Sequence, residues 1–345
     1  MPAMRPVVDA LVSFSGRGAC TDAERRASLW LHDELRRRGH EAFVETRWVR
    51  PQRNATLALG CLLAVAGSLL STAAPPAGLA VSAAGALTLL AWTAALPLPF
   101  LVRRATQHVL TAAPEGVPLV IAAAYDAPKR GLALNDRWRA RRPPRAVLAA
   151  CGVALAGAAG ARLAGVEGTW LGALQLVPTA ILLVAFAAAL DIALSGPSPG
   201  ANDNASGVAV ALAVFDELTR EPPRALAPML LLVGAGHAVP RAISRERLGG
   251  VLLELGPCGA GSPALRGRGA DAVAARAAAA LGAATRGPRP SARGVRVGCL
   301  DERGIAPRAH QPDDTTVDEA AMSAALDLTL GVVDALDSEL RVGRA

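Results

Sequence analysis

Two long uncharged or weakly charged stretches interrupt an otherwise polar chain. Residues 54–102 contain no charged side chain at all. A helix that crosses the hydrocarbon core of a bilayer needs about 20 apolar residues, so this stretch is long enough for two. Pro75-Pro76 falls in its middle, and we therefore predict two transmembrane helices, Thr56–Ala74 and Gly78–Val102.

The second apolar stretch, residues 146–194, has the same form but a weaker signal. We predict a helix over Ala146–Leu163 and another over Trp170–Leu194. The charged residues in this stretch are Arg162, Glu167 and Asp191. The first two fall at the expected turn and the third near a helix end, where its carboxylate can reach water or a cap. Buried core helices are the alternative, but small domains seldom bury so much uncharged sequence.

The arginines predict the orientation of these helices. Ten arginines precede the first stretch, and Lys and Arg are again dense in residues 103–145. The expected turns carry a single arginine between them. Because cytoplasmic loops carry the excess of Lys and Arg, we expect a multi-pass cell-membrane protein whose N-terminus, middle segment and C-terminal region are all cytoplasmic.

The polar segments have an α/β pattern. A capping box, Thr21 to Glu24, opens a helix that ends before Gly39. Further expected elements are strands at Glu41–Val49, Pro118–Ala124, Pro228–Val233 and Gly250–Leu255, and helices at Val208–Arg220 and Asp318–Leu340. This alternation favours a mixed, largely parallel sheet sandwiched by helices. We expect one domain in three parts, residues 1–53, 103–145 and 195–345, with transmembrane hairpins 54–102 and 146–194 inserted into it.

Composition excludes some classes of protein. The net charge is +7, but the arginines are scattered and aromatic residues make up only 3% of the chain, so no nucleic-acid partner is expected. The five cysteines form no CxxC pair and are odd in number, which argues against a disulfide framework. The N-terminus lacks the sustained apolar region of a signal peptide. The expected partner is the lipid bilayer.

The most informative motif is the segment Pro199–Gly207, with the sequence PGANDNASG. A loop of this kind can present a carboxylate at the start of a helix, and Asp203 or Asn204 could equally be an ordinary helix cap. The segment resembles the loop that supplies the bridging aspartate in the co-catalytic zinc aminopeptidases of metallopeptidase family 28. Four other segments also resemble the family and occur along the chain in the family's order, the first before this loop and the others after it: VIAAAYDAP, LLLVGAGHAVP, VLLELG and GIAPRAHQPDDTTVD.

Some functional positions of that family are retained. The resemblance makes Asp203 the aspartate that bridges two zinc ions. Asp126 keeps the orienting position of the family's His-x-Asp motif, and His310 keeps the terminal His ligand. Glu254 stands where the family has an aspartate ligand. Each of these assignments is implied by the resemblance.

Other positions depart from the family's pattern. Ala124 replaces the histidine of His-x-Asp, and Gly236 and His237 replace two consecutive glutamates, one a general base and one a ligand. One metal position would then have only Asp203 and Glu254, while the other could combine Asp203 with His237 and His310. Two imidazoles and a carboxylate suit one zinc ion. The alternatives are an ordinary loop histidine at 237 and a turn cap at 310.

These changes lead to two functional hypotheses. The first is a membrane-anchored, aminopeptidase-like protein with a partly eroded metal site and weak or absent peptidase activity, acting as a binding or scaffold module for a peptide or small amide. The second is an active hydrolase with one metal ion at Asp203, His237 and His310. A transporter is disfavoured because the apolar stretches hold almost no internal charge. Small residues in Ala146–Ala161 permit close helix packing but do not predict an oligomeric state.

Overall fold

The computed structural model describes residues 4–96, 98–99, 101–112, 115–134, 143–237, 250–268, 271–285 and 294–342. The chain forms two compact units. An α/β unit contains residues 1–51, 104–129 and 196–345, and a helical unit contains residues 52–103 and 130–195. Arg137, Arg139, Arg141 and Arg142, which contribute to the predicted orientation, lie outside the described residues.

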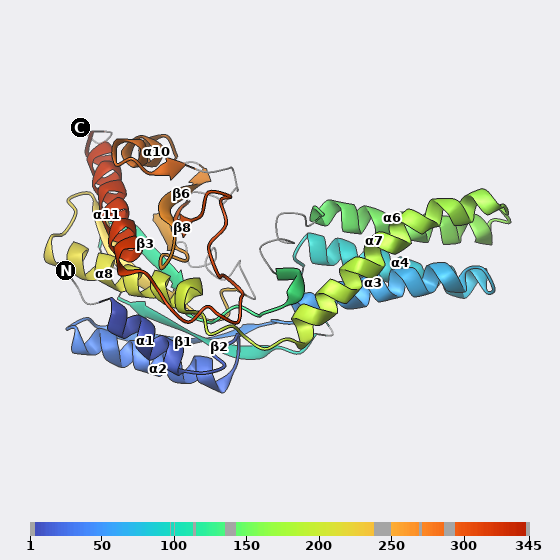
Figure 1. The fold of residues 1–345 in the computed structure, drawn as a ribbon, viewed down its shortest axis with the longest axis horizontal. Coiled ribbons are helices and arrows are strands. Elements are labelled where there is room, and N and C mark those ends of the chain that lie inside the picture. The colour runs from blue at the N-terminus through green and yellow to red at the C-terminus, as the bar shows by residue number, and fades with distance from the viewer. Residues whose placement is uncertain are drawn as a thin grey trace. The chain divides into compact units, whose positions relative to one another are not determined.

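A mixed sheet is the centre of the α/β unit (Figure 1). Within the described residues it has eight strands in the order β1-β2-β4-β3-β5-β8-β6-β7. The strands are β1 (Ala42–Val49), β2 (Arg104–Thr111), β3 (Val117–Ala124), β4 (Leu226–Val233), β5 (Val251–Leu255), β6 (Ser262–Arg268), β7 (Ala284–Thr285) and β8 (Gly294–Leu300). Strands β4, β3, β5 and β8 are parallel, whereas β2 and β6 join this central group in antiparallel fashion.

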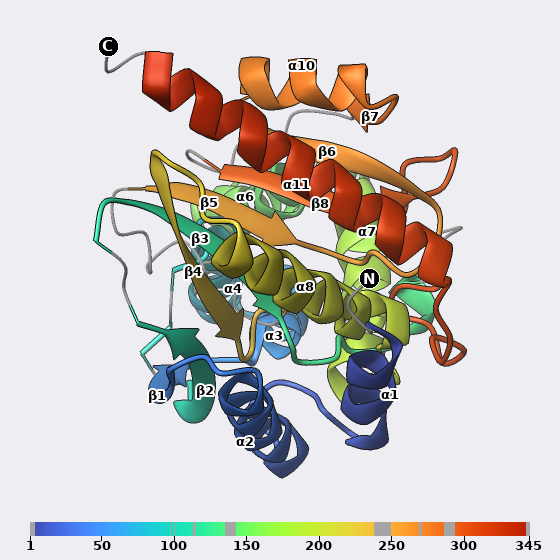
Figure 2. The same cartoon turned by 90° about the vertical axis from the view of Figure 1, so that its left-hand side faces the viewer.

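The α-helices among the described residues of this unit are α1 (Arg5–Ser13), α2 (Asp22–Arg37), α8 (Gly207–Arg220), α10 (Asp271–Ala280) and α11 (Glu319–Val342). Helices α8 and α11 cross the same face of the sheet (Figure 2). That face holds the main apolar core, in which Ile121, Leu212 and Leu232 are fully buried. Half of the predicted capping box is confirmed, since the Thr21 hydroxyl accepts a hydrogen bond from the Glu24 amide. The reciprocal bond is absent, because the Glu24 carboxylate accepts from the amide of Cys20 and the Thr21 amide donates to the carbonyl of Gly18.

The strands on either side of each apolar stretch are neighbours in the sheet. Strand β1 precedes the first stretch and β2 follows it, and the two pair antiparallel from Ala42 opposite Thr111 to Val49 opposite Arg104. Strand β3 precedes the second stretch, and β4 follows it as a parallel neighbour. The three polar segments therefore assemble into one sheet.

The described part of the helical unit has the helices α3 (Arg53–Leu70), α4 (Pro75–Thr93), α6 (Arg145–Leu163) and α7 (Thr169–Leu194), besides the short turn η1 (Leu132–Leu134). Each of these four helices is long and apolar enough to cross a membrane. The prediction that the second helix runs to Val102 is wrong, because α4 ends at Thr93. The helix ends in a left-handed turn, in which Ala95 has a φ of +53° and the Leu96 amide donates to the carbonyl of Ala91 at 2.8 Å.

Glycines bring α3 and α4 into close contact. Gly67 of α3 lies against the backbone of Ser82, and Gly85 of α4 lies against the backbone of Ala64. Any side chain at either glycine would overlap the opposite backbone. Small residues at such spacing let helix backbones approach closely, which is the usual way for apolar helices to associate in lipid.

Candidate functional site

The Asp203 loop begins at a glycine that the conformation requires. Gly200 has a φ of +72°, and a Cβ placed there would lie 2.9 Å from the Cβ of Ala127. The turn that follows, η2 (Ala201–Ser206), is fully buried and leads directly into α8. Asp203 and Asn204 have non-helical backbone angles within it. The loop therefore presents the Asp203 carboxylate at the end of the sheet where β3, β4 and β5 finish.

Two side chains fix the shape of this loop. The carboxylate of Asp314 accepts hydrogen bonds from the amides of Asn202 at 2.7 Å and Asp203 at 3.0 Å. The Asn204 amide group donates to the carbonyls of Ala124 at 3.0 Å and Leu255 at 3.1 Å, and so joins the ends of β3 and β5. Burial raises the pKa of Asp314 to about 6.

A buried arginine supports the loop from the other side. Arg17 donates to the carbonyls of Tyr125 at 2.6 Å and Gly200 at 3.2 Å, and also to that of Leu11. Burial lowers the pKa of Arg17 to about 10, so the group stays charged at neutral pH. Nothing in the sequence distinguished this arginine from its exposed neighbours.

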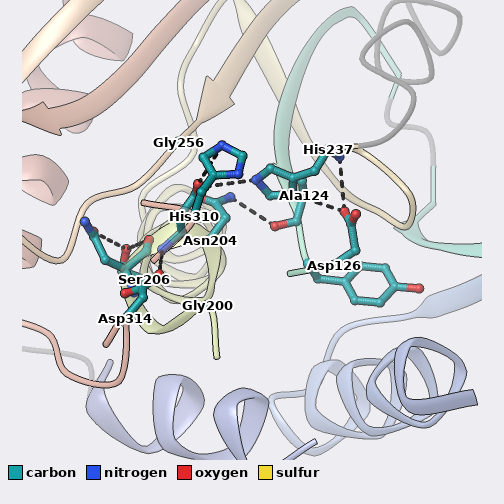
Figure 3. A network of polar contacts seen from close by, with 12 residues as sticks. Ala124, Asp126, Gly200, Asn204, Ser206, His237, Gly256, His310 and Asp314 are labelled. Carbon is teal, nitrogen blue, oxygen red and sulfur yellow. Dashed lines mark hydrogen bonds and ion pairs between the residues drawn. The ribbon is translucent and has the colours of Figure 1, made fainter. Parts of the chain in front are cut away.

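The centre of the site is an imidazole between two carboxylates. His237 follows β4, and its Nε2 lies 2.9 Å from Oδ1 of Asp203 while its Nδ1 lies 3.3 Å from Oδ1 of Asp126. Figure 3 shows His237 and Asp126 facing each other. Burial alone lowers the pKa of His237, but the charges of Asp203 and Asp126 outweigh burial and raise it to about 10. The imidazole is therefore a cation at neutral pH.

Asp126 thus has an imidazole partner from an unexpected strand. In the His-x-Asp motif of the aminopeptidases that the chain resembles, the imidazole next to the aspartate would come from position 124, two residues earlier in the chain. The structure places Ala124 there, and the imidazole of His237 comes instead from the end of the neighbouring strand β4. The sequence identified both residues but gave no reason to pair them.

His310 contacts the opposite side of Asp203. Its Nε2 lies 3.8 Å from Oδ2 of Asp203, and its Nδ1 lies 3.0 Å from the backbone carbonyl of Lys129. His237 and His310 therefore approach different oxygens of the same carboxylate. The structure brings together Asp203, His237, His310 and Asp126.

Glu254 has a different partner. Its Oε1 lies 3.2 Å from Nη2 of Arg296, which is its neighbour in the parallel register of β5 and β8. This ion pair engages one oxygen of the carboxylate that the resemblance assigns to a metal. The sequence did not single out Arg296.

The two degenerate positions, Ala124 and Gly236, lie side by side. A Cβ at position 236 would lie 2.6 Å from the Cβ of Ala124 and 3.5 Å from Oδ1 of Asp126. A larger residue at 236 therefore requires a shift of β3 or of the loop after β4. Gly236 therefore fits the packing of this chain. It also has no side chain that could act as a general base.

A buried glutamate behind the site holds the loop that carries His237. Oε1 of Glu24 accepts hydrogen bonds from the amide of Ala235 at 2.6 Å and the hydroxyl of Thr106 at 2.9 Å, and Oε2 accepts one from the amide of Cys20 at 2.7 Å. Burial and the nearby Asp126 raise the pKa of Glu24 to about 8. The capping box predicted Glu24 as a cap but gave no sign of this longer-range contact.

The donors do not fit a catalytic zinc ion. Such a site typically has three protein ligands and one open position. The part of the chain that the structure describes contains no group of three or more His, Cys, Asp or Glu arranged to hold a metal. Asp203 has one imidazole on each side, Glu254 is paired with Arg296, and both nitrogens of His237 face carboxylates.

Comparisons with known proteins address the fold alone. No family model matches the chain, and no curated protein matches it by sequence. Solved structures do match. A glutaminyl cyclase from Tannerella forsythia has a TM-score of 0.53 at 14% identity, with 96% of this chain and 97% of that one covered. A zinc aminopeptidase from Bacillus subtilis has a TM-score of 0.53 at 12% identity, with 96% and 93% covered.

A Zn-dependent exopeptidase from Parabacteroides distasonis is similar to the same degree, with a TM-score of 0.52 at 12% identity and coverage of 95% and 96%. The α/β fold, a mixed sheet flanked by helices, is thus shared with zinc exopeptidases, zinc aminopeptidases and glutaminyl cyclases. At such identities the likeness defines a fold, and the chemistry has to be argued from the residues of the site.

Proposed function

We propose that this chain is a membrane-anchored, aminopeptidase-like protein of the metallopeptidase 28 type whose metal site has been eroded, so that peptidase activity is weak or absent. The observation that carries the proposal is the position of His237 between Asp203 and Asp126. Its imidazolium neutralises carboxylates that a metal would otherwise neutralise. In this reading the domain works as a binding or scaffold module for a peptide or small amide at the membrane surface.

The missing general base supports the same proposal. Position 236 has no side chain that could take a proton, and general-base catalysis typically contributes about 10²–10⁴-fold to a rate. Oδ1 of Asp126, the nearest carboxylate, is engaged by both the amide and the ring of His237, while its Oδ2 is buried without a partner among the described residues. A hydrolase of this fold without such a base would be slow even with a metal bound.

Activity and metal content of the same sample test the proposal. The full chain, purified in detergent, should cleave aminoacyl-nitroanilides no faster than buffer, both with added Zn²⁺ and after chelation. Metal analysis should find far less than one equivalent of zinc. Cleavage at ordinary enzyme rates that is lost on chelation would refute the proposal.

The alternative hydrolase with one metal ion makes the opposite prediction. It requires about one equivalent of zinc that disappears in His310→Ala, because His310 contributes one of only three donors. His40→Ala is the matched control, since His40 pairs with Asp216 elsewhere in the same unit. Zinc lost in His310→Ala and retained in His40→Ala would favour the alternative.

Membrane anchoring is tested separately. The four apolar helices support it by their length and composition, and the close glycine contacts between α3 and α4 support it by their packing. The full chain should stay with the membrane fraction after alkaline carbonate washing, which strips peripheral proteins. Release into the wash would contradict the anchoring.

A further inference from the structure

Two arginines from different helices lie against one indole ring in the helical unit. The guanidinium carbon of Arg53 is 5.2 Å from the centroid of the Trp92 ring, and that of Arg145 is 5.5 Å from it. Arg53 is the first residue of α3, Arg145 is the first residue of α6, and Trp92 lies in the last turn of α4. We call Arg53, Trp92 and Arg145 the arginine–tryptophan cluster.

Helix ends of both signs lie at this cluster. A helix N-terminus carries a partial positive charge, which normally favours an acidic residue in the first turn. Neither α3 nor α6 has an acidic residue there, and neither has a side chain that caps its first amides. The N-termini of α3 and α6 therefore lie near the two guanidinium groups, and the C-terminus of α4 beside Trp92 offsets part of their positive potential. The two guanidinium groups carry full charges, so the cluster as a whole favours a bound anion.

The tryptophan supplies a further donor. Its indole Nε1 is buried and has no hydrogen-bond partner among the described residues. Buried indole N–H groups usually find an acceptor. An oxygen of a bound anion would provide one, and phosphate offers several oxygens that also suit the planar guanidinium group.

We propose that the arginine–tryptophan cluster binds the phosphate group of an anionic phospholipid in the cytoplasmic leaflet. The proposal rests on the membrane anchoring proposed above. The excess of Lys and Arg in the adjoining segments places this end of the helices on the cytoplasmic side, where anionic lipids are enriched. Tryptophan is also typical of the headgroup region of a bilayer.

Native mass spectrometry of the detergent-purified full chain tests the site with two lipids, phosphatidylglycerol and phosphatidylcholine. The wild type should retain phosphatidylglycerol in preference to phosphatidylcholine. One basic residue near an anionic surface contributes about 1 kcal/mol, or roughly fivefold in affinity, so R53Q/R145Q should weaken phosphatidylglycerol binding by about 25-fold. The single variants R53Q and R145Q should each lose about fivefold, which keeps the test valid if the double variant fails to fold.

Arg162 provides the matched control. It lies in the last turn of α6, at the other end of the helix from Arg145, and donates to the Ser71 hydroxyl at 2.9 Å. R162Q should bind phosphatidylglycerol like the wild type. An equal loss in R162Q, or no preference for phosphatidylglycerol in the wild type, would overturn the proposal.

Two further measurements separate the remaining outcomes. Inorganic phosphate, added at the same concentration as the lipid, should not displace phosphatidylglycerol; equal competition would overturn the assignment to a lipid. Carbonate washing addresses the anchoring independently. A chain that resists washing but shows no lipid preference retains its anchoring and refutes only the lipid site.

Discussion

At the scale of single residues, His237 keeps two buried carboxylates together. Without the imidazole, Asp126 and Asp203 would face each other with no cation between them. We expect His237→Ala to lower the free energy of unfolding by about 3 kcal/mol. This value is at the lower end of the usual cost of breaking a buried ion pair. We choose the lower end because 18% of the His237 side chain is exposed to solvent. Chemical denaturation of the purified chain measures the change.

The control for this prediction is His40→Ala. His40 lies 2.8 Å from Asp216, but Asp216 also pairs with Arg38 at 2.6 Å and so keeps a cation when the imidazole is removed. The expected loss is about 1 kcal/mol, that of an ordinary hydrogen bond. Equal losses in the two variants would show that the double carboxylate contact of His237 has no special energetic role.

The raised pKa of Glu24 predicts how the stability of the folded chain depends on pH. Its pKa is raised from the ordinary 4.5 to about 8 in the folded chain. Between pH 4.5 and 8 the folded state holds a proton on Glu24 that the unfolded state has lost. The stabilisation that this proton gives is complete below pH 4.5 and is lost as the pH rises through 8. We expect Glu24→Gln to flatten the fall in melting temperature across this window. An unchanged slope would contradict the assignment.

The motif segments predicted several residues of the site and missed others for a physical reason. Asp203, Asp126 and His310 lie in local patterns of glycine, proline and strand residues, and such patterns can be read from sequence. Arg17 and Glu24 act through backbone groups far along the chain, at Gly200 and Ala235. A hydrogen bond to a distant backbone leaves no pattern near the donor or acceptor.

At the scale of elements, the contact between α3 and α4 depends on glycine. A Cβ at Gly85 would overlap the backbone of Ala64. We expect Gly85→Ala to destabilise the helical unit by about 1–3 kcal/mol, the usual cost of overpacking. The thermal unfolding of the full chain in a lipid nanodisc measures the loss.

Gly157 of α6 is the control for this contact. No atom lies within 4 Å of a Cβ placed there. Gly157→Ala should therefore stabilise the chain by up to about 1 kcal/mol, because alanine is the better helix former. If both alanine variants changed stability alike, the close contact between α3 and α4 would carry no energetic weight.

Hydropathy and periodicity predicted these helices, and several strands, because each has a strong local signal. Strand β2 was not predicted because its sequence, RATQHVLT, is mostly polar. Hydrogen bonding to β1 and β4 stabilises the strand in place of a strong local strand preference. Strands β6 and β8 were missed in a region rich in Gly and Arg. Long-range pairing, which no short window contains, determined these strands.

At the scale of the whole molecule, the sheet constrains how the chain could cross a membrane. Strands β1 and β2 pair along their full length although residues 50–103 separate them. Strands β3 and β4 are neighbours although the second apolar stretch lies between them. If either stretch crossed the bilayer an odd number of times, these strands would lie on opposite sides and could not pair. The proposed membrane insertion therefore requires each stretch to cross an even number of times.

Labelling of introduced cysteines in intact cells tests this topology. Cys20 is the one native cysteine that is not buried among those described, so Cys20→Ser provides the background. Cysteines are introduced at exposed positions of the α/β unit and, separately, in the turns of the two hairpins. The positions in the α/β unit are Asp33, Glu115 and Glu319, and those in the turns are Thr72 and Glu167.

Because β1, β2, β3 and β4 belong to one sheet, the three positions of the α/β unit must behave alike toward a maleimide that cannot cross the membrane. Positive-inside bias predicts that they face the cytoplasm, so we expect them to react only after the cells are lysed. Thr72→Cys and Glu167→Cys should react in intact cells, since both hairpin turns would then face outward. Labelling of all five positions in intact cells would overturn the membrane insertion. Labelling of the α/β positions but not the turns would keep the insertion and reverse its orientation, and the lipid site would then face the outer leaflet.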